Sequence, residues 1–421
     1  MANHRAGYHF KILSNPEFLS AGTAVKDLMY PDRVLIGCSP TPSGHRAAGA
    51  LAGIYGGWVP QDRIIRMNVW SSELSKLVAN SMLAQRISSI NSISAIYEKT
   101  DAEIDEVATA VGCDPRIGNG FLKAGIGFGG SCFKKDIFSL IYLATSLGLE
   151  EVSEYWHQVI KMNDHQRERF CQRVVQCLNN TLTGKKITFL GYAFKANTSD
   201  TRGSLTLEII KTLLNENPAE IAIFDSCCDT TNIREELKAV PLSSLDGPKE
   251  EDRCRLRVYS NVYEACTGSS VVLITTEYEY FGNSAVSSPG YEGEKYPDPR
   301  PFAGPRVTEM DILALHNFLL QSSSISAHGR GKADPLQRFR DEPSCPDGCT
   351  ECEPVGPRGH SMSDLSSEFC GSKGSVDWPR IINSMKIPKW LFDGKGIIDP
   401  KEMAELNIRV ESIGRQSRFW V

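Results

Sequence analysis

The sequence predicts an α/β protein in three parts: the remnant of an N-terminal Rossmann domain, a helical middle with a long central helix, and a C-terminal Rossmann-like parallel sheet with a long insertion. Three observations lead to this prediction. Residues 71–180 have helical periodicity, strands alternate with helices after Gly184, and a stretch rich in Pro, Gly and Ser interrupts the last part. We place the parts at residues 1–70, 71–180 and 181–421, with the insertion at about 283–375.

Length, charge and composition argue against several classes of protein. A chain of 421 residues is long enough for two or three domains with cores of their own. The net charge of −5 is spread along the chain, so we expect neither nucleic acid nor a membrane as a partner. No apolar run approaches the roughly 20 residues of a membrane span, and the N-terminus lacks an apolar signal core. Because the 13 scattered cysteines suit free thiols, we expect a cytoplasmic protein.

The first 70 residues contain too few elements for a complete nucleotide-binding domain. We expect a short strand from residue 10 that ends on Asn15-Pro16, a strand at 32–37, a helix at 43–55 and a strand at 64–67. Glu17 follows the end of the first strand, where open α/β sheets keep ligand-binding residues. A surface glutamate is the alternative.

The middle of the chain is predicted to be helical. A long helix starts at Ser71 or Ser72 as N-cap, and its apolar positions are Leu74, Leu77, Val78, Leu83, Ile87, Ile90 and Ile93. Lys76 and Asn80 are four residues apart and share a face of this helix. We expect a second helix at 102–111 and helical structure again from 140 to about 178. Helical units of this kind often form dimer interfaces.

A glycine-rich segment at residues 121–130 is followed by a predicted helix whose N-terminus carries a candidate reactive cysteine. Its glycines allow close approach of a ligand, and Cys132 then stands at the N-terminus of the predicted helix, followed by Lys134 and Lys135. The helix dipole and the two lysines favour a thiolate, so Cys132 is a candidate nucleophile. A buried structural cysteine is the alternative. The match of residues 125–130 to G-x-G-x-x-G is not a dinucleotide site, because no strand precedes it.

After Gly184 the pattern changes to alternating strands and helices. We predict strands at 185–191, 220–225, 270–275, 389–394 and 408–414, and a helix at 205–216. This alternation is typical of a parallel sheet. The first turn, at 191–195, lacks the full phosphate-binding fingerprint.

The insertion at 283–375 carries little predicted structure apart from a helix at 308–320 that starts with a capping box. It also contains Cys345, Cys349 and Cys352, with His360 and Cys370 downstream. A zinc site is a possible interpretation, but three close cysteines and a distant fourth ligand match the usual spacing poorly. We therefore predict no metal.

Five motifs together resemble the UDP-glucose 6-dehydrogenase family, within the UDP-glucose/GDP-mannose dehydrogenases. They are Ser14-Asn-Pro-Glu-Phe-Leu19, Ser72-Glu-Leu-Ser-Lys-Leu77, residues 125–136, Ala193-Phe-Lys195 with Asp200-Thr-Arg202, and Phe392-Asp-Gly394. The motifs occur in the family's order and cover nearly the whole chain apart from the insertion.

The resemblance implies a reaction and a set of catalytic residues. Members of the family use two NAD⁺ to oxidise the C6 alcohol of UDP-glucose to the carboxylate of UDP-glucuronate, through a thiohemiacetal and a thioester on the enzyme. By resemblance, Cys132 is the nucleophile and Lys76 stabilises the oxyanion. Asp136 and Asn80 hold or activate water, and Glu17 is an acid or base in thioester hydrolysis.

The resemblance also implies contacts for the substrate and the cofactor. UDP-glucose would touch Glu17, Lys76, Asn80, Arg116, Phe121, Leu122, Lys123, Ala124, Gly125, Gly129, Phe194, Lys195 and Lys395. In the family, the residue at the position of Arg116 reaches a sugar across a dimer contact, which implies a homo-oligomer formed through the helical middle. Lys135 and Arg202 would lie near NAD.

The chain departs from the family's pattern in four places. Only nine residues precede Phe10, where members have the first strand and glycine fingerprint of an NAD-binding domain. Ala21 stands in place of a glutamate, Lys395 in place of an arginine, and Gly203 in place of an acidic residue. Exchanging arginine for lysine keeps the charge but loses the bidentate geometry.

Three interpretations of the N-terminal departure stay open. The sequence can be part of an ordinary dehydrogenase, a short and inactive nucleotide-sugar-binding or regulatory subunit, or one half of a site that another chain completes. The intact set of chemical residues favours the first. For the chain alone, we expect weak binding of UDP-sugars and hardly any binding of NAD⁺, because the main cofactor site would be missing.

Overall fold

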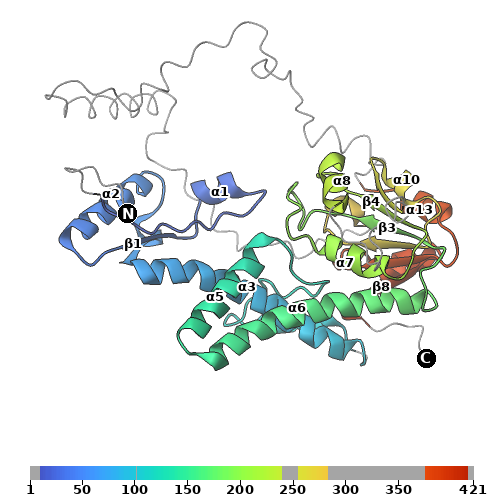
Figure 1. Cartoon of the computed structure of the whole chain (residues 1–421), viewed down its shortest axis with the longest axis horizontal. Coiled ribbons are helices and arrows are strands. Elements are labelled where there is room, and N and C mark those ends of the chain that lie inside the picture. Colours follow the sequence, from blue (N-terminus) through green and yellow to red (C-terminus); the bar gives the residue numbers. More distant parts are fainter. Residues whose placement is uncertain (1–9, 101, 239–254, 283–374, 416–421) are drawn as a thin grey trace, which may run out of the picture. The chain divides into compact units, whose positions relative to one another are not determined.

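The computed structural model describes residues 10–100, 102–238, 255–282 and 375–415 (Figure 1). All of them belong to one of the two compact units of the chain, residues 1–286 with 366–421. This unit is α/β with parallel sheets, as the sequence predicts. The helix predicted at 308–320 and the cysteines of the insertion lie outside the described residues.

The N-terminal part is a pair of parallel strands joined by a helix. Strand β1 (Val34–Cys38) pairs with β2 (Ile64–Asn68), and α2 (Pro42–Tyr55) connects them, followed by the short η1 (Gln61–Arg63). Thr41 caps α2 by accepting a hydrogen bond from the backbone N–H of Gly44 at 3.0 Å. Helix α1 (Ala24–Met29) precedes β1 and has no buried residue.

The strand predicted from residue 10 is wrong. Only Ser14 pairs, in an isolated antiparallel bridge with Gly37 whose two N–H···O bonds measure 2.9 and 2.7 Å. Phe10 and Ile12 are exposed. Beyond the bridge the side chain of Asn15, rather than its backbone, donates to the carbonyl of Leu35 at 2.8 Å, so no continuous ladder forms.

Four helices build the middle: α3 (Val69–Tyr97), α4 (Ile104–Gly112), α5 (Ser131–Ser146) and α6 (Glu150–Cys177). The N-cap of α3 is Asn68, which accepts from the N–H of Ser71 at 2.8 Å, rather than Ser71 or Ser72. The helical structure predicted from 140 to about 178 is divided between α5 and α6. Gly148 separates them with a φ of +72°, a left-handed conformation that ends a helix.

The buried face of α3 differs from the predicted apolar stripe. Of the seven apolar positions expected to form the stripe, Ile90 is buried, while Ile93 is exposed. The buried positions are mainly small or polar, among them Ser81, Ala84 and Ser88. Because small side chains let helices approach closely, their polar groups can bond across the interface; the Ser88 hydroxyl donates to the carbonyl of Val159 on α6 at 2.8 Å.

The C-terminal part is a six-stranded parallel sheet in the order β5-β4-β3-β6-β7-β8. Its strands are β3 (Lys186–Leu190), β4 (Glu220–Phe224), β5 (Leu256–Tyr259), β6 (Val271–Ile274), β7 (Trp390–Asp393) and β8 (Arg409–Ser412). The five predicted strands are confirmed. Sequence analysis missed β5, which has no fully buried residue and hence a weak apolar pattern.

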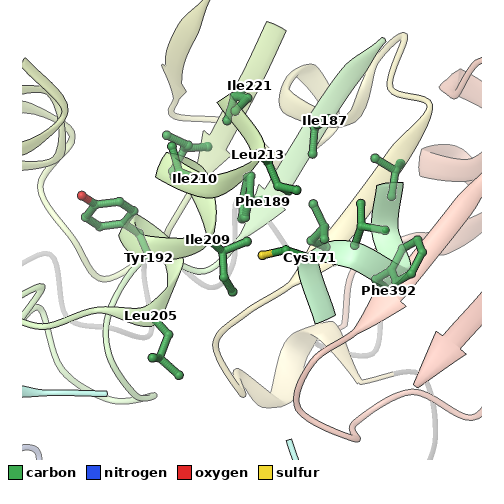
Figure 2. Close-up of a cluster of buried hydrophobic side chains, with 14 of the residues drawn as sticks. Cys171, Ile187, Phe189, Tyr192, Leu205, Ile209, Ile210, Leu213, Ile221 and Phe392 are labelled. Carbon is green, nitrogen blue, oxygen red and sulfur yellow. The ribbon is translucent and has the colours of Figure 1, made fainter. Parts of the chain in front are cut away.

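Helices cover both faces of this sheet. One face packs against the second half of α6, α7 (Leu205–Leu214) and α8 (Thr230–Lys238), and Figure 2 shows α7 side chains such as Ile209 and Leu213 close to Phe189 of β3. The other face packs against α10 (Val262–Cys266), η2 (Glu279–Phe281), α13 (Trp378–Ser384) and α14 (Pro400–Glu405). The rings of Phe170 on α6 and Phe392 on β7 pack edge-to-face with their centroids 6.0 Å apart. Helix α6 therefore belongs both to the helical middle of the chain and to the core of the C-terminal sheet.

We expect Phe170→Ala to lower the free energy of unfolding by about 3 kcal/mol or more, because a buried aromatic ring leaves a cavity. Urea denaturation followed by circular dichroism measures the change. Gln172→Ala is the control, since Gln172 lies two residues further along the same helix and is exposed. A loss below about 1 kcal/mol for Phe170→Ala would show that α6 is not held by this core.

Candidate active site

The glycine-rich segment is held by polar groups from two sides. Gly125 donates its N–H to Asn91 Oδ1 and accepts from Gln166 Nε2 with its carbonyl, both at 2.9 Å. Asn163 accepts from the N–H of Phe128 at 2.8 Å and donates to the carbonyl of Phe128 at 3.0 Å. Asn91 lies on α3, and Asn163 and Gln166 on α6, so these three side chains replace the partners that a regular strand or helix would provide.

The C-terminal part holds the same segment from the other side. The N–H of Ile126 donates to the carbonyl of Gly394, and the N–H of Gly130 donates to the carbonyl of Gly203, both at 2.9 Å. Gly130 has a φ of +86°, and a Cβ there would lie 2.8 Å from the ring of Phe194. Gly203 is left-handed as well, with φ +69°, and a Cβ there would lie 2.9 Å from Gly130. The acidic residue that the resemblance led us to expect at Gly203 would therefore not fit this backbone.

Cys132 is the second residue of α5, and it is exposed. The structure therefore does not support the alternative of a buried structural cysteine. Arg202 is held by Asp200 in a bidentate ion pair at 2.9 and 2.8 Å, and this pairing raises the pKa of Arg202, with a smaller contribution from the nearby Cys132. The turn that leads into α5 thus lies against Phe194 and against Gly203, which follows Arg202.

Asp136 lies one turn after Cys132 on α5 and is buried. It accepts a hydrogen bond of 2.6 Å from the side chain of Asn80, which is also buried, on α3. Its other oxygen pairs with the exposed Lys135 at 3.2 Å. The structure therefore brings Asn80 and Asp136 into contact, and this contact joins the helices that carry Cys132 and Lys76.

Lys76 lies one turn before Asn80 on α3 and pairs with Glu17 at 3.4 Å. Its ammonium also lies 5.1 Å from the centre of the Phe18 ring. The loop of Glu17 is fixed by the bond from Asn15 to Leu35 and by a 2.8 Å bond from the hydroxyl of Tyr55 to Asn15. Glu17 is thus a positioned carboxylate beside Lys76, although 61% of its side chain is exposed.

The remaining substrate candidates differ in the contacts that their side chains make. Lys395 pairs with Glu277 at 2.9 Å, and Lys123 lies close to Gly396, where a Cβ would be 3.4 Å from its Cε. Lys195 lies 5.7 Å from the ring of Phe194. Ala124 is buried in a small apolar cluster, so its backbone alone can face a ligand.

Arg116 stands apart from the other candidates. Its guanidinium pairs with Asp114 at 2.6 Å, which raises the pKa of Arg116, and 87% of its side chain is exposed. Phe121 is also exposed at its edge, with φ +62°, and contacts Phe133 edge-to-face at 6.4 Å. The next residue, Leu122, is half-buried. Gly129 packs against the backbone of Gly203.

Sequence analysis missed the residues that hold the site together. Arg86 donates to the carbonyls of Ile117, Gly118 and Gly120 at 2.7–2.8 Å, and it thereby fixes the turn before Phe121. Asn91, Asn163, Gln166 and Glu277 were missed as well. The available signal was the polar residues on the buried faces of α3 and α6, which a search for apolar periodicity passes over.

The described residues contain neither a membrane-spanning helix nor a cluster of metal-binding side chains. No helix among them is long and apolar enough to span a membrane. Within the same ranges, no three His, Cys, Asp or Glu side chains cluster in a way that could hold a metal ion, and the cysteines of the insertion fall outside those ranges.

Three family models match successive parts of the chain. The NAD binding domain of the UDP-glucose/GDP-mannose dehydrogenase family matches residues 1–58, the central domain matches residues 70–165, and the UDP binding domain matches residues 188–290.

Curated relatives and a solved structure agree with these matches. UDP-glucose 6-dehydrogenase of Bos taurus is 52% identical over 281 residues, which are 66% of this chain and 56% of the relative. The enzyme of the same name from Drosophila melanogaster is 48% identical over 280 residues, covering 66% of this chain and 58% of the relative. A UDP-glucose dehydrogenase structure from Pyrobaculum islandicum has a TM-score of 0.56 and 30% identity, covering 65% of this chain and 57% of that one.

The chain thus spans little more than half the length of the curated relatives that it matches. The three domain matches follow one another in the order of the chain, and the identity to the curated relatives is about one half over the matched residues. The chain therefore belongs to the UDP-glucose/GDP-mannose dehydrogenase family.

Proposed function

We propose that the protein is a UDP-glucose 6-dehydrogenase, which oxidises the C6 alcohol of UDP-glucose to a carboxylate in two NAD-dependent steps. The relatives carry this name, and the family models describe NAD and UDP binding domains. The observation that carries the proposal is the exposed Cys132 at the start of α5, with Arg202 beside it and the bonded pair of Asp136 and Asn80 one turn away.

The residues of the site can be assigned to the steps of this reaction. The thiolate of Cys132 adds to the C6 aldehyde, which prevents its escape, and loss of hydride from the adduct gives a thioester. Lys76 stabilises the oxyanion formed at C6, as a cation does for developing negative charge. Asp136 and Asn80 hold the water that attacks the thioester, and Glu17 moves a proton in that hydrolysis. Hydrolysis frees the carboxylate product and restores the thiol.

Among the described residues, cations near Cys132 suit the NAD cofactor better than the turn between β1 and α2 does. Lys135 on α5 and Arg202 in the loop after β3 are exposed cations, and they would hold the dinucleotide. In the turn between β1 and α2, the N–H of Gly44 is bonded to the Thr41 hydroxyl at 3.0 Å and is therefore not available to a phosphate. NAD⁺, when bound, accepts the hydride lost from C6.

We assign the substrate to the region between the glycine-rich segment and the C-terminal sheet. The contacts would come from residues 121–125 and 129, from Phe194 and Lys195, and from Lys395. Lysines suit the charge of a diphosphate. In this division, residues 1–70 belong to the NAD-binding part, 71–180 to the central part and 181–421 to the UDP-sugar-binding part.

We also propose a homo-oligomer formed through the helical middle. Large apolar side chains are exposed on α5 and α6, with Phe138 and Tyr142 one turn apart on α5 and Val152 and Tyr155 on α6. Tyr142 is 76% exposed, which is costly for an aromatic side chain unless another surface covers it. A second copy would bury this surface and would bring Arg116, which stands apart within one chain, within reach of a neighbouring site.

The first prediction from the proposed function tests Cys132. We expect Cys132→Ser to abolish the reduction of NAD⁺ with UDP-glucose, because a hydroxyl at neutral pH does not replace a thiolate as nucleophile. The measurement is the absorbance of reduced nicotinamide. Cys113→Ser is the matched control, since Cys113 is also exposed but lies at the end of α4.

Turnover that survives Cys132→Ser would contradict the proposed mechanism. If the unmodified protein binds UDP-glucose but never turns it over, the chain is a nucleotide-sugar-binding or regulatory subunit instead.

The second prediction tests Asp136. We expect Asp136→Asn to lower kcat by about 100-fold, because the change removes the charge that activates water. Binding of UDP-glucose should change by less than about threefold, since the size of the side chain and its contact with Asn80 are kept. Asp164→Asn on α6, which breaks a 3.0 Å ion pair with Arg167, is the control. A kcat within about threefold of the unmodified protein would remove Asp136 from the mechanism.

The third prediction concerns the oligomer. We expect Tyr142→Glu to shift the protein to a smaller species in size-exclusion chromatography with light scattering, because a charge would be buried in the interface. Val25→Glu on α1 is the control, as Val25 is exposed to a similar degree, 78% against 76%. An unchanged mass would place the interface elsewhere.

A further inference from the structure

Glu277 occupies the topological switch point of the C-terminal sheet. The chain builds outward from β3 to β5 and then returns to β6 on the other side of β3, so β3 and β6 are the neighbours at which the order reverses. Ligands of open α/β sheets bind at the carboxyl ends of the strands at this point. Glu277 follows the end of β6 by three residues.

The segment that carries Glu277 is fixed against the turn after β3. The hydroxyl of Thr275 donates to the carbonyl of Gly191 at 2.7 Å, and the hydroxyl of Thr276 donates to the carbonyl of Ala193 at 2.8 Å. That turn continues into Phe194 and Lys195, so the segment before Glu277 is anchored to the same turn as two of the substrate candidates.

A carboxylate at this place is unexpected, because it would repel the diphosphate of the proposed substrate. Its partner accounts for it: Glu277 pairs with the ammonium of Lys395 at 2.9 Å, and only 15% of the Lys395 side chain is exposed. Burial raises the pKa of Glu277, but Lys395, with a further contribution from Lys123, brings it below its ordinary value. Glu277 is therefore ionised at neutral pH and is paired with the Lys395 ammonium.

The backbone of Lys395 is fixed independently of Glu277. The carboxylate of Asp393 accepts the N–H groups of residues 395, 396, 397 and 398 at 2.7–2.9 Å. The carbonyl of Gly394 accepts from Ile126 at 2.9 Å, which keeps the segment of Lys123 beside the same turn. What remains free is the flexible stem of Lys395, and Glu277 is the group that directs it.

We propose that Glu277 is a positioning residue for the diphosphate of a nucleoside diphosphate ligand, acting through Lys395. This inference rests on the proposed function and deepens it. Glu277 lowers the freedom of the Lys395 ammonium and leaves Glu277, Lys395 and Lys123 with a net charge of +1. Lys395 stands where the family has arginine, whose planar fork is rigid by itself, so a lysine there has more need of a carboxylate to hold it.

A double-mutant cycle with UDP as the probe tests the proposal. Calorimetric titration of the full chain gives the Kd of UDP for the unmodified protein, Glu277→Gln, Lys395→Ala and the double variant. We expect Glu277→Gln to weaken UDP binding about tenfold, the order of a lost charged hydrogen bond. In the Lys395→Ala background the same change should have no effect, because Glu277 acts through Lys395.

Two results would overturn the proposal. Tighter UDP binding by Glu277→Gln would mean that the carboxylate only repels the ligand. An equal loss in both backgrounds would mean that Glu277 supports the fold and not Lys395; urea denaturation would show the matching loss of stability. The matched control is Glu208→Gln, which breaks an ion pair of the same length, 2.9 Å, with Lys211 on α7.

The cycle is independent of dehydrogenase activity. A protein that binds UDP but does not reduce NAD⁺ would defeat the proposed function and leave the role of Glu277 standing. If the protein oxidises UDP-glucose but the mutant cycle shows no coupling between Glu277 and Lys395, the proposed function would stand and the role of Glu277 would be overturned. Absence of UDP binding by the unmodified protein would overturn both.

Discussion

The site depends on the backbone hydrogen bonds of residues 121–130. A glycine-rich segment without regular structure must find partners for its N–H and C=O groups outside itself. It finds them in the helical middle through Asn91 and Gln166, and in the C-terminal part through the carbonyls of Gly203 and Gly394. The start of α5, and with it Cys132, is therefore set by two parts of the chain at once.

This constraint explains the polar buried faces of α3 and α6. A stripe of large apolar residues would pack the helices but would leave the glycine segment without donors and acceptors. The small and amide side chains pack closely and bond at the same time; Asn80 reaches Asp136 in this way, and Asn163 reaches both backbone groups of Phe128. Each is buried, so removing one would leave an unsatisfied polar group.

The sheet uses carboxylates in the same manner at its carboxyl ends. Asp225, after β4, accepts from the N–H groups of Tyr192 and Ala193 in the turn after β3, and from those of Cys227 and Cys228 in its own turn, at 2.6–2.9 Å. In many nucleotide-binding sheets, an acid at the end of the second strand binds a ribose. Here its oxygens are used to shape the turns that carry the substrate candidates.

The sequence by itself determined most of the elements, because periodicity and glycines are local. The five strands predicted for the C-terminal sheet, the helix that begins beside Cys132, and the five motifs all follow from neighbours along the chain, whereas the strand predicted from residue 10 was wrong. The break at Gly148 was missed, and β5 had too weak a pattern to be found. Only the tertiary structure decided which side chains meet. Asn80 bonds to Asp136, which lies 56 positions along the chain, and Glu277 pairs with Lys395, which lies 118 positions along the chain. No local sequence pattern encodes contacts over such separations. Their contact depends on helix packing and on the order of strands in the sheet, which the whole fold sets.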